Sequence, residues 1–169
     1  DLVHADHVIS TRCKGIKGET TLLTIKDQAT GLASSIPLPD KSAEEAYHPL
    51  ANFIEGLPAV NFSTDNSLEL TAALDKLKSD LRVKHKKSVE HRPQSHGIGE
   101  RWNQEVINGT RCVLFQSGLT SEFWSYAAPY WTLCYNFQKN PKFDDKSPMQ
   151  LKDPEITERK FLPFGCGVT

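Results

Sequence analysis

The first third of the chain alternates apolar runs with short glycine-containing turns. Apolar or β-branched residues dominate positions 2–9, 20–25 and 32–38, and each run has the length of a strand. The connections at 14–18 and 28–31 contain glycine and are short. We therefore predict three strands paired as an antiparallel meander. Pro37 and Pro39 indicate that the third strand frays or lies at a sheet edge, because proline cannot donate to a strand ladder.

The next stretch changes to helical spacing and then returns to a strand. Ser42, with Glu45 three residues later, has the form of a capping box. The helix that follows is expected to bury Ala46, Leu50, Phe53 and Ile54. Pro49 falls inside it and predicts a late start or a kink. A short apolar run at 59–62 then predicts a strand buried on both faces.

The second half of the chain is mostly helical in pattern. A first helix is marked by Leu70, Ala73, Leu74 and Leu77, and a second, from Ile98, by Trp102, Val106 and Val113. Gly109 is expected to break or bend the second helix. A third helix starts near Thr120, and its apolar stripe is expected in the core or at a subunit interface: Phe123, Trp124, Ala127, Tyr130, Trp131 and Cys134.

The pattern predicts a single α/β domain. Residues 1–140 form the core in this interpretation. Residues 141–169 are polar, contain several prolines and read as an extension that packs on or wraps the core, with a short helix at 148–151. A chain of 169 residues is long enough for one real hydrophobic core.

Composition narrows the class of protein. The net charge of −1 offers no global basic signature, so any affinity for nucleic acid must come from a local patch. The four cysteines are far apart and form no Cys-x-x-Cys pair, which favours reduced thiols in an intracellular protein. No stretch approaches the ~20 apolar residues that span a bilayer, so we expect no membrane association.

Three carboxylates lie on separate predicted elements. Asp6 is inside the first strand, Asp65 follows the strand at 59–62, and Glu100 is near the start of a helix. At about 100° per residue, Glu100 lies roughly 160° from the centre of the apolar stripe of its helix, so it can face a cleft. A lone glutamate there is usually only favoured by the helix dipole. Three separated carboxylates, however, are what a two-magnesium phosphoryl-transfer site needs.

Basic residues gather between the second and third of these acids. The candidate phosphate contacts are Arg82, Lys84, Lys86 and Lys87, with Arg92 and Arg101 further along. An alternative interpretation, with equal weight, is that residues 82–87 are only a solvated loop or an edge strand. Residues 91–99 read as a mobile loop containing proline and glycine, which is a candidate gate over the site.

Two other kinds of site are disfavoured. His4 and His7 could suggest zinc, but residues three apart on a strand point to opposite faces. Cys112 lies within an apolar helix and is interpreted as a packing residue rather than a nucleophile.

An ordered series of motifs runs through the chain. It comprises Asp6, then Asp65-Asn66 with Glu69, then Pro93-Gln94-Ser95-His96-Gly97 leading into Glu100-Arg101 and Asn103, followed by Phe123-Trp124 with Ala127, Asn136, Ser147-Pro148 and Phe164-Gly165-Cys166. In this order the motifs resemble the catalytic core of a retroviral-type integrase, most closely the copia class of LTR retrotransposons. Two positions differ from the family pattern: His96 stands for the usual Asn or Gln, and Ser67 for the usual Gly.

The resemblance implies a ribonuclease H-like fold, with a mixed five-stranded sheet flanked by helices on both faces. It implies DNA integration by 3′-end processing and strand transfer, with two Mg²⁺ or Mn²⁺ ions held by Asp6, Asp65 and Glu100. The implied partners are element-end DNA, target DNA and further copies of the chain, acting in the nucleus after a cytoplasmic particle stage. The alternatives are another ribonuclease H-like nuclease or transposase, and a domesticated or decayed integrase core that binds DNA or protein without catalysis.

Overall fold

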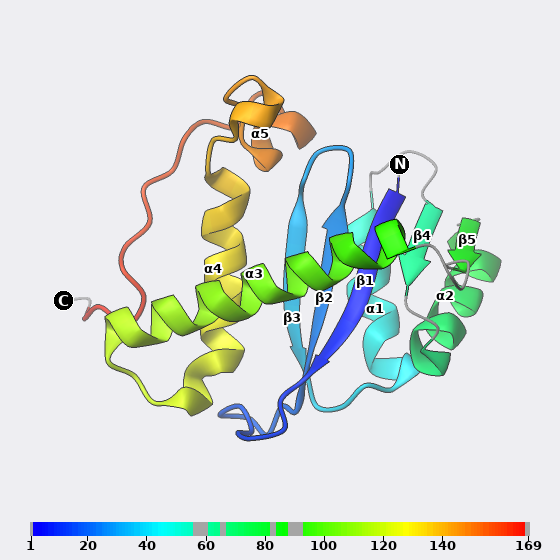
Figure 1. Cartoon of the computed structure of the whole chain (residues 1–169), viewed down its shortest axis with the longest axis horizontal. Coiled ribbons are helices and arrows are strands. Elements are labelled where there is room, and N and C mark those ends of the chain that lie inside the picture. The colour runs from blue at the N-terminus through cyan, green and yellow to red at the C-terminus, as the bar shows by residue number, and fades with distance from the viewer. Residues whose placement is uncertain (1, 56–60, 65–66, 82–83, 88–92, 168–169) are drawn as a thin grey trace.

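The centre of the molecule is a five-stranded mixed sheet. The computed structural model describes residues 2–55, 61–64, 67–81, 84–87 and 93–167, with the backbone alone described at 80–81, 84–87 and 93–96. The strand order is β3–β2–β1–β4–β5 (Figure 1). The strands are β1 (Leu2–Ile9), β2 (Thr21–Asp27), β3 (Ala33–Leu38), β4 (Asn61–Thr64) and β5 (Lys84–Lys87). The first three form the predicted antiparallel meander, with β3 at an edge, and β4 and β5 add in parallel.

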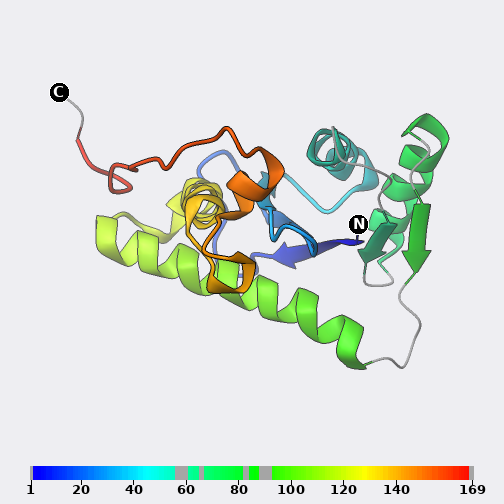
Figure 2. The same ribbon diagram turned by 90° about the horizontal axis from the view of Figure 1, so that it is seen from above.

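Helices cover both faces of this sheet. They are α1 (Ala43–Ile54), α2 (Leu68–Leu81), α3 (Pro93–Ser117), α4 (Trp124–Phe137) and α5 (Pro148–Lys152), with the 3₁₀ turns η1 (Ser121–Phe123) and η2 (Pro141–Phe143). Figure 2 shows α1 and α2 on one side of the sheet and α3 with α4 on the other. The predicted α/β class, with helices on both faces of a mixed sheet, is confirmed.

The alternation of side chains along β1 explains why the sheet has two different layers. Successive residues of a strand point to opposite faces. Val3 and Ala5 join the hydrophobic core under α1 and α2. Val8, on the other face, packs with the residues under α3 and α4. His4 and Asp6 share the face of Val8, so the polar positions of β1 are directed toward α3.

The start of α1 is set by a cap, as the sequence predicts. Ser42 is the N-cap residue, and its hydroxyl accepts a hydrogen bond from the Glu45 N–H at 3.4 Å. The late start that Pro49 suggests is wrong, because α1 begins at Ala43 and continues through Pro49. Burial of Ala46, Leu50 and Ile54 favours the helix despite the donor that proline lacks.

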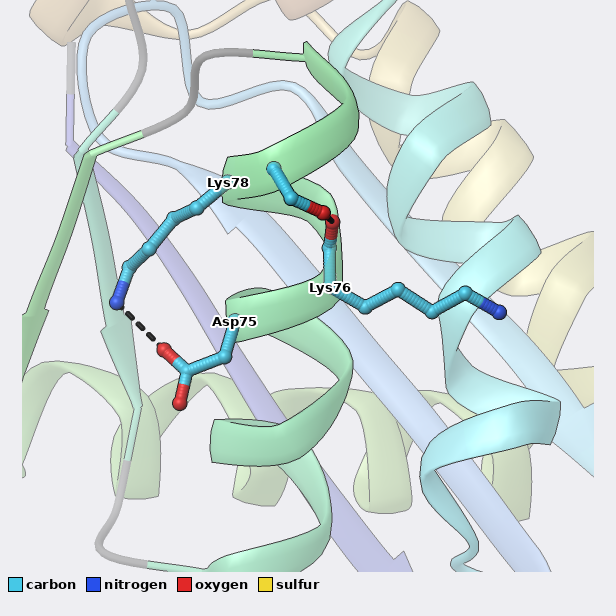
Figure 3. A network of polar contacts seen from close by, with 4 residues as sticks. Asp75, Lys76 and Lys78 are labelled. Carbon is cyan, nitrogen blue, oxygen red and sulfur yellow. Dashed lines mark hydrogen bonds and ion pairs between the residues drawn. The ribbon is translucent and has the colours of Figure 1, made fainter.

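The outer surface of α2 carries charged side chains that pair along the helix. Lys78 donates to the Asp75 carboxylate at 2.6 Å, three residues apart, as Figure 3 shows. Lys76 points the other way, and its ammonium lies 4.5 Å from the centre of the Tyr47 ring on α1. Exposed pairs of this kind contribute little stability, so α2 is held mainly by its buried face of Leu70, Ala73, Leu74 and Leu77.

Two predictions about α3 are wrong. The helix begins at Pro93, so the part of the expected gate loop from residue 93 to 99 is helical. Proline fits the first turn of a helix, where its missing N–H has no partner to lose. The break expected at Gly109 is also absent, since α3 continues to Ser117. Glycine is needed at this position because a side chain would collide with Trp131 of α4: an added Cβ would lie 2.0 Å from that ring. Gly109 is thus a contact point between two helices.

The core positions of α4 also differ from those expected. Its buried residues are small or polar: Ser125, Ala127, Ala128, Thr132 and Asn136. Of the predicted stripe only Ala127 is fully buried, and the aromatic members are half-buried at the flanks of the helix. The reason is the close approach of α4 to β3 and α3, which leaves room only for small side chains at the contact.

The C-terminal segment lies along the outside of α4. Phe164 is 5.3 Å from Tyr130 between ring centres, and Phe161 is 5.3 Å from Phe137. The Tyr130 hydroxyl donates to the Leu162 carbonyl. These contacts attach the segment to the core, and the proposed division of the chain at residue 140 stays a prediction.

Cysteines and membrane spans were also predicted from the sequence. All four cysteines are free. Cys112 is exposed on α3, so its interpretation as a packing residue is wrong. No helix in the described part of the chain has the length and apolar character required to cross a membrane.

Candidate active site on the α3 face of the central strand

Asp6 is held in place by two hydrogen bonds. It is half-buried on β1, the middle strand of the sheet. The His7 backbone N–H donates to Oδ1 at 2.7 Å, and Nδ2 of Asn103, on α3, donates to Oδ2 at 2.6 Å. Both bonds fix the orientation of the carboxylate. The second bond also ties α3 to the central strand.

Thr24 completes this contact from the neighbouring strand. It lies opposite Asp6 in the β1–β2 ladder and is buried. Its Oγ1 donates to Asn103 Oδ1 at 2.6 Å and lies 3.2 Å from the Asp6 carbonyl oxygen. The Asn103 amide therefore bridges a hydroxyl and a carboxylate, with its oxygen toward the first and its nitrogen toward the second. The sequence analysis did not find this role of Thr24 because its partners are 18 and 79 residues away along the chain.

Glu100 lies one helical turn before Asn103 on α3. Residues three apart on a helix share a face, so Glu100 is on the side of α3 that meets β1 at Asp6. Its side chain is exposed, as expected for a residue off the apolar stripe, whereas Trp102 and Val106 are buried. The structure thus brings Asp6 and the Glu100 turn of α3 to the same region.

Asp65 lies outside the described residues. In the parallel ladder of β1 and β4, Thr64 is opposite Ala5, the residue before Asp6. Asp65 is the next residue after Thr64 in the sequence. Within the described part of the chain, no group of three His, Cys, Asp or Glu side chains could hold a metal ion. Only two of the three expected ligands belong to that part, so the three-carboxylate set stays a prediction.

The predicted basic residues are described to different extents. The backbone of Lys84, Lys86 and Lys87 forms the edge strand β5, which pairs with β4. The side chains of these three residues, and the whole of Arg82 and Arg92, lie outside the described part. Arg101 is exposed on α3, next to Glu100, and lines a cavity. The role of these residues in DNA binding stays a prediction.

Two basic groups lie on the same face of the sheet, close to Asp6. His4 is almost fully buried, and this burial lowers its pKa, although a hydrogen bond with Gln28 opposes the shift. Burial also lowers the pKa of Lys26, against the attraction of Glu105 at 3.9 Å. His4 and Lys26 are partners in the β1–β2 ladder. His4, Lys26 and the Lys26 partner Glu105 therefore lie on the side of the sheet that carries Asp6.

Comparison with solved structures identifies the class to which the fold corresponds. The fold is the ribonuclease H-like fold of integrase catalytic cores. The crystal structure of the catalytic core domain of BIV integrase matches with a TM-score of 0.67, covering 89% of this chain and 92% of that one. At 16% sequence identity, this likeness establishes the fold alone.

A sequence comparison adds a particular relative. The retrovirus-related Pol polyprotein from transposon TNT 1-94 of Nicotiana tabacum is 25% identical over 178 residues, which cover 98% of this chain. The match spans 13% of that polyprotein, so the chain corresponds to a small part of its relative. No family model matches the chain. The resemblance to an integrase core that the sequence motifs indicate is confirmed by the relative and the fold together.

Proposed function

We propose that this chain is the catalytic core of a retrotransposon integrase, which processes the 3′ ends of element DNA and joins them to target DNA. The observation that carries the proposal is the Asn103–Asp6 hydrogen bond of 2.6 Å. It fixes a half-buried carboxylate on the central strand and docks against it the helix turn that bears Glu100. A site for cleaving and rejoining phosphodiesters needs carboxylates from separate elements arranged in this way.

The donor set fits magnesium or manganese. Hard divalent cations bind carboxylate oxygens, and the orientation of Asp6 is already set by Asn103 and the His7 N–H. Asp6, Asp65 and Glu100 would hold two ions. When bound, such ions neutralise charge on the phosphate and activate the attacking hydroxyl. The second hydrogen-bond partner of Asn103, Thr24, keeps its amide from turning away from the carboxylate.

The reaction consists of two displacements at phosphorus. In the first, a water oxygen bonds to phosphorus, the bond from phosphorus to the 3′ oxygen breaks, and that oxygen leaves with a proton as a free 3′-hydroxyl. In the second, the oxygen of this hydroxyl bonds to a phosphorus of target DNA and loses its proton. The bond from that phosphorus to the target 3′ oxygen breaks, and that oxygen leaves with a proton as a 3′-hydroxyl of the cut target strand. The protein's part is to position the strands and to present ordered negative charge at Asp6 and Glu100.

DNA would be held by local positive charge, since the whole chain has a net charge of −1. The proposed contacts are Arg82, Lys84, Lys86, Lys87, Arg92 and Arg101. Each duplex phosphate contact contributes about 0.9 to the salt dependence of binding. The Lys84/Lys86/Lys87→Ala variant should therefore show a smaller salt slope, and an unchanged slope would assign these lysines to a solvated edge. We propose further that the chain acts as a homo-oligomer in the nucleus, after a stage in a cytoplasmic particle.

The test compares Glu100→Gln with a matched variant on the opposite layer, Glu44→Gln. Both residues are exposed on helices, so both variants should fold with the stability of the parent, within about 0.5 kcal/mol. Mn²⁺ binding is measured by calorimetry, and nicking and strand transfer on labelled DNA. We expect Glu100→Gln to lose activity by orders of magnitude and Glu44→Gln to keep it.

Two outcomes would contradict the proposal. One is parental activity in Glu100→Gln. The other is a folded parent that binds no Mn²⁺ and leaves DNA uncut, which would favour a binding module without catalysis.

A further inference from the structure

The C-terminal segment meets α4 at Tyr130. The Tyr130 ring centre is 5.3 Å from that of Phe164, and the Tyr130 hydroxyl donates to the Leu162 carbonyl. Cys134 lies one helical turn after Tyr130 on α4, so the two side chains share a face of the helix. Cys166 belongs to the C-terminal segment, 32 positions after Cys134. Two cysteines that are distant in the sequence are therefore carried by elements that touch at one tyrosine.

A tight turn keeps Cys166 close to this contact. The Cys166 N–H donates to the Pro163 carbonyl at 3.2 Å, and Gly165 between them has a φ of 75°. A type II turn has this hydrogen bond and a positive φ at its third residue. The Cα atoms of its first and fourth residues lie less than about 7 Å apart. Since Pro163 follows Leu162, the turn returns Cys166 to the part of the segment that Tyr130 binds.

The turn is also seated closely on the rest of the molecule. A Cβ atom added at Gly165 would lie 3.0 Å from Ser117 Cβ and 3.1 Å from Leu119 Cδ1. The backbone at Gly165 therefore packs directly against the connection between α3 and η1. This packing fixes the residue next to Cys166 relative to the core, so the position of Cys166 does not depend on contacts of its own exposed side chain.

Both thiols lie near the Tyr130 hydroxyl. Cys134 is half-buried and Cys166 is exposed, and both are free. Burial raises the pKa of Tyr130, and a side-chain hydrogen bond with Cys134 and negative charge on Cys134 and Cys166 raise it further. Cys134 and Cys166 therefore interact with the same phenol group, and the packing of the segment on α4 explains why they do.

The other two cysteines are placed differently. The Cys13 thiol donates to the Lys14 carbonyl at 3.3 Å and accepts from the Ser121 hydroxyl at 3.4 Å. Cys112 is exposed on α3. Neither is among the groups that shift the pKa of Tyr130. Cys13 and Cys112 therefore serve as internal controls for thiols outside the pair.

We propose that Cys134 and Cys166 are a site of reversible oxidation, at which a peroxide forms a disulfide that ties the C-terminal segment to α4. The exposed Cys166 reacts first. Its thiolate sulfur bonds to one peroxide oxygen, the O–O bond breaks, and a sulfenic acid and hydroxide result. The Cys134 sulfur then bonds to the Cys166 sulfur, the S–O bond breaks, and the departing hydroxide leaves as water with the Cys134 proton. Two thiols and one hydrogen peroxide thus give one disulfide and two waters.

The disulfide would close a loop that contains η2 and α5. In the reduced chain the segment after α5 is held by the Tyr130 contacts and by the Lys139–Glu158 ion pair at 2.6 Å. An exposed ion pair of this kind contributes little. A covalent link next to Tyr130 restricts the unfolded chain and so favours the attached segment. The inference goes beyond the proposed function and needs neither metal nor DNA.

The test locates the bond by mass spectrometry. The reduced chain is treated with hydrogen peroxide, the remaining thiols are alkylated, and the chain is digested without reductant. No Lys or Arg lies between Cys112 and Cys134, so trypsin leaves both on one peptide, and chymotrypsin is used to separate them at the aromatic residues between. We expect a peptide with Cys134 joined to Cys166 as the main disulfide product, reversed by dithiothreitol.

Matched variants remove one thiol at a time. Cys134→Ser and Cys166→Ser should each abolish the disulfide within the chain. Cys13→Ser and Cys112→Ser should keep it at the parental yield. A main product that joins Cys166 to Cys13 or Cys112, or a chain that gives only sulfinic acids or disulfides between two molecules, would overturn the inference.

A second measurement uses the parent chain alone and shows whether the fold positions the pair. The chain is equilibrated in glutathione buffers of different reduced-to-oxidised ratio, once folded and once in denaturing urea. The effective concentration of one thiol at the other follows from the ratio at which half of the pair is linked. We expect it to be at least about tenfold higher in the folded chain, because the unfolded chain must close the loop by chance. Equal values in the two states would overturn the inference.

Discussion

The two faces of the sheet are built from different chemistry. Under α1 and α2 the apolar cluster is larger, with Phe62, Leu50 and Leu74 fully buried, and the buried Thr21 and Thr64 alternate onto the same face. Under α3 and α4 the apolar cluster is smaller, and buried polar groups lie beside it, including Thr24, Ser35, Thr132 and Asn136. The α3–α4 face therefore depends more on directional contacts, and one of them, through Thr24, reaches Asp6.

Asn136 and Thr132 on the α3–α4 face are tolerated because they have partners, whereas Trp102 Nε1 and Ser125 Oγ are buried without a hydrogen bond in the described part of the chain. The Asn136 side chain accepts from the Ala33 N–H at 3.0 Å and donates to the Ala33 carbonyl at 2.8 Å, so it acts as a neighbouring strand for the edge of β3. The Thr132 hydroxyl donates to Ser35 Oγ at 2.7 Å. Buried polar groups are costly when unpaired and specify one arrangement when paired. This face therefore fixes the position of α4 and, through Asn103, of α3.

The largest expected effects come from removing one large side chain on each face. Trp102→Ala should lower the free energy of unfolding by about 3–5 kcal/mol, and Leu74→Ala by about 2–5 kcal/mol, because both side chains are buried. Urea unfolding of the two variants measures both losses. A loss below about 1 kcal/mol for Trp102→Ala would mean that the Trp102 side chain contributes little to the stability of the core.

A smaller effect is expected at the contact between α3 and α4. Gly109→Ala places a methyl group against Trp131 and should destabilise the fold by about 1–3 kcal/mol through overpacking. Gly99→Ala, on the same helix, meets no atom within 4 Å and should stabilise by up to about 1 kcal/mol. The melting temperatures of the two variants, compared with that of the parent, test both expectations. Equal shifts in both variants would mean that helix propensity, rather than the contact, governs this position.

Removal of the Asn103 amide tests the polar network itself. Asn103→Ala should cost about 1 kcal/mol of stability, since Thr24 and Asp6 lose one partner each. The Mn²⁺ affinity should fall by about 10- to 100-fold, because the Asp6 side chain is no longer held in one orientation. Calorimetry on Asn103→Ala and on the exposed Asn108→Ala provides the comparison. Unchanged Mn²⁺ affinity in Asn103→Ala would show that metal binding does not depend on the Asn103 hydrogen bonds.

The smallest expected effect is a pH dependence from His4. Burial lowers its pKa in the folded chain below the ordinary value of 6.5. The unfolded chain therefore binds the proton more tightly, so the stability due to neutral His4 is present above pH 6.5 and is lost as pH falls below it. One proton changes stability by at most about 1.4 kcal/mol per pH unit. Urea unfolding from pH 7.5 to 5 should show a flatter profile for His4→Gln than for the parent, and no flattening for His48→Gln.

The sequence alone determined the local elements of this protein. The strand runs of the meander, the Ser42 cap and the apolar spacing of Leu70 to Leu77 depend on neighbours within a few residues, and they appear as predicted. The run at 59–62 was expected to be buried on both faces, but the described strand is Asn61–Thr64, in which Phe62 and Thr64 are buried and Asn61 and Ser63 are half-buried. The off-stripe position of Glu100 follows from helix geometry in the same way. The order of motifs also sufficed to predict the fold class, a mixed five-stranded sheet with helices on both faces.

Only the tertiary structure decided how distant segments meet. Gly109 was expected to break α3, but its role depends on Trp131, 22 positions further along, which no local pattern contains. The bond from Asn103 to Asp6 spans 97 residues, and the cavity beside it is assembled from β1, β2, α3, α4 and η2. Helix spacing and strand alternation reveal which face a residue occupies, whereas the partner on that face is set by packing and chain topology. The acids of the candidate site could therefore be proposed from sequence, but the role of Thr24 and the cavity beside the site could not.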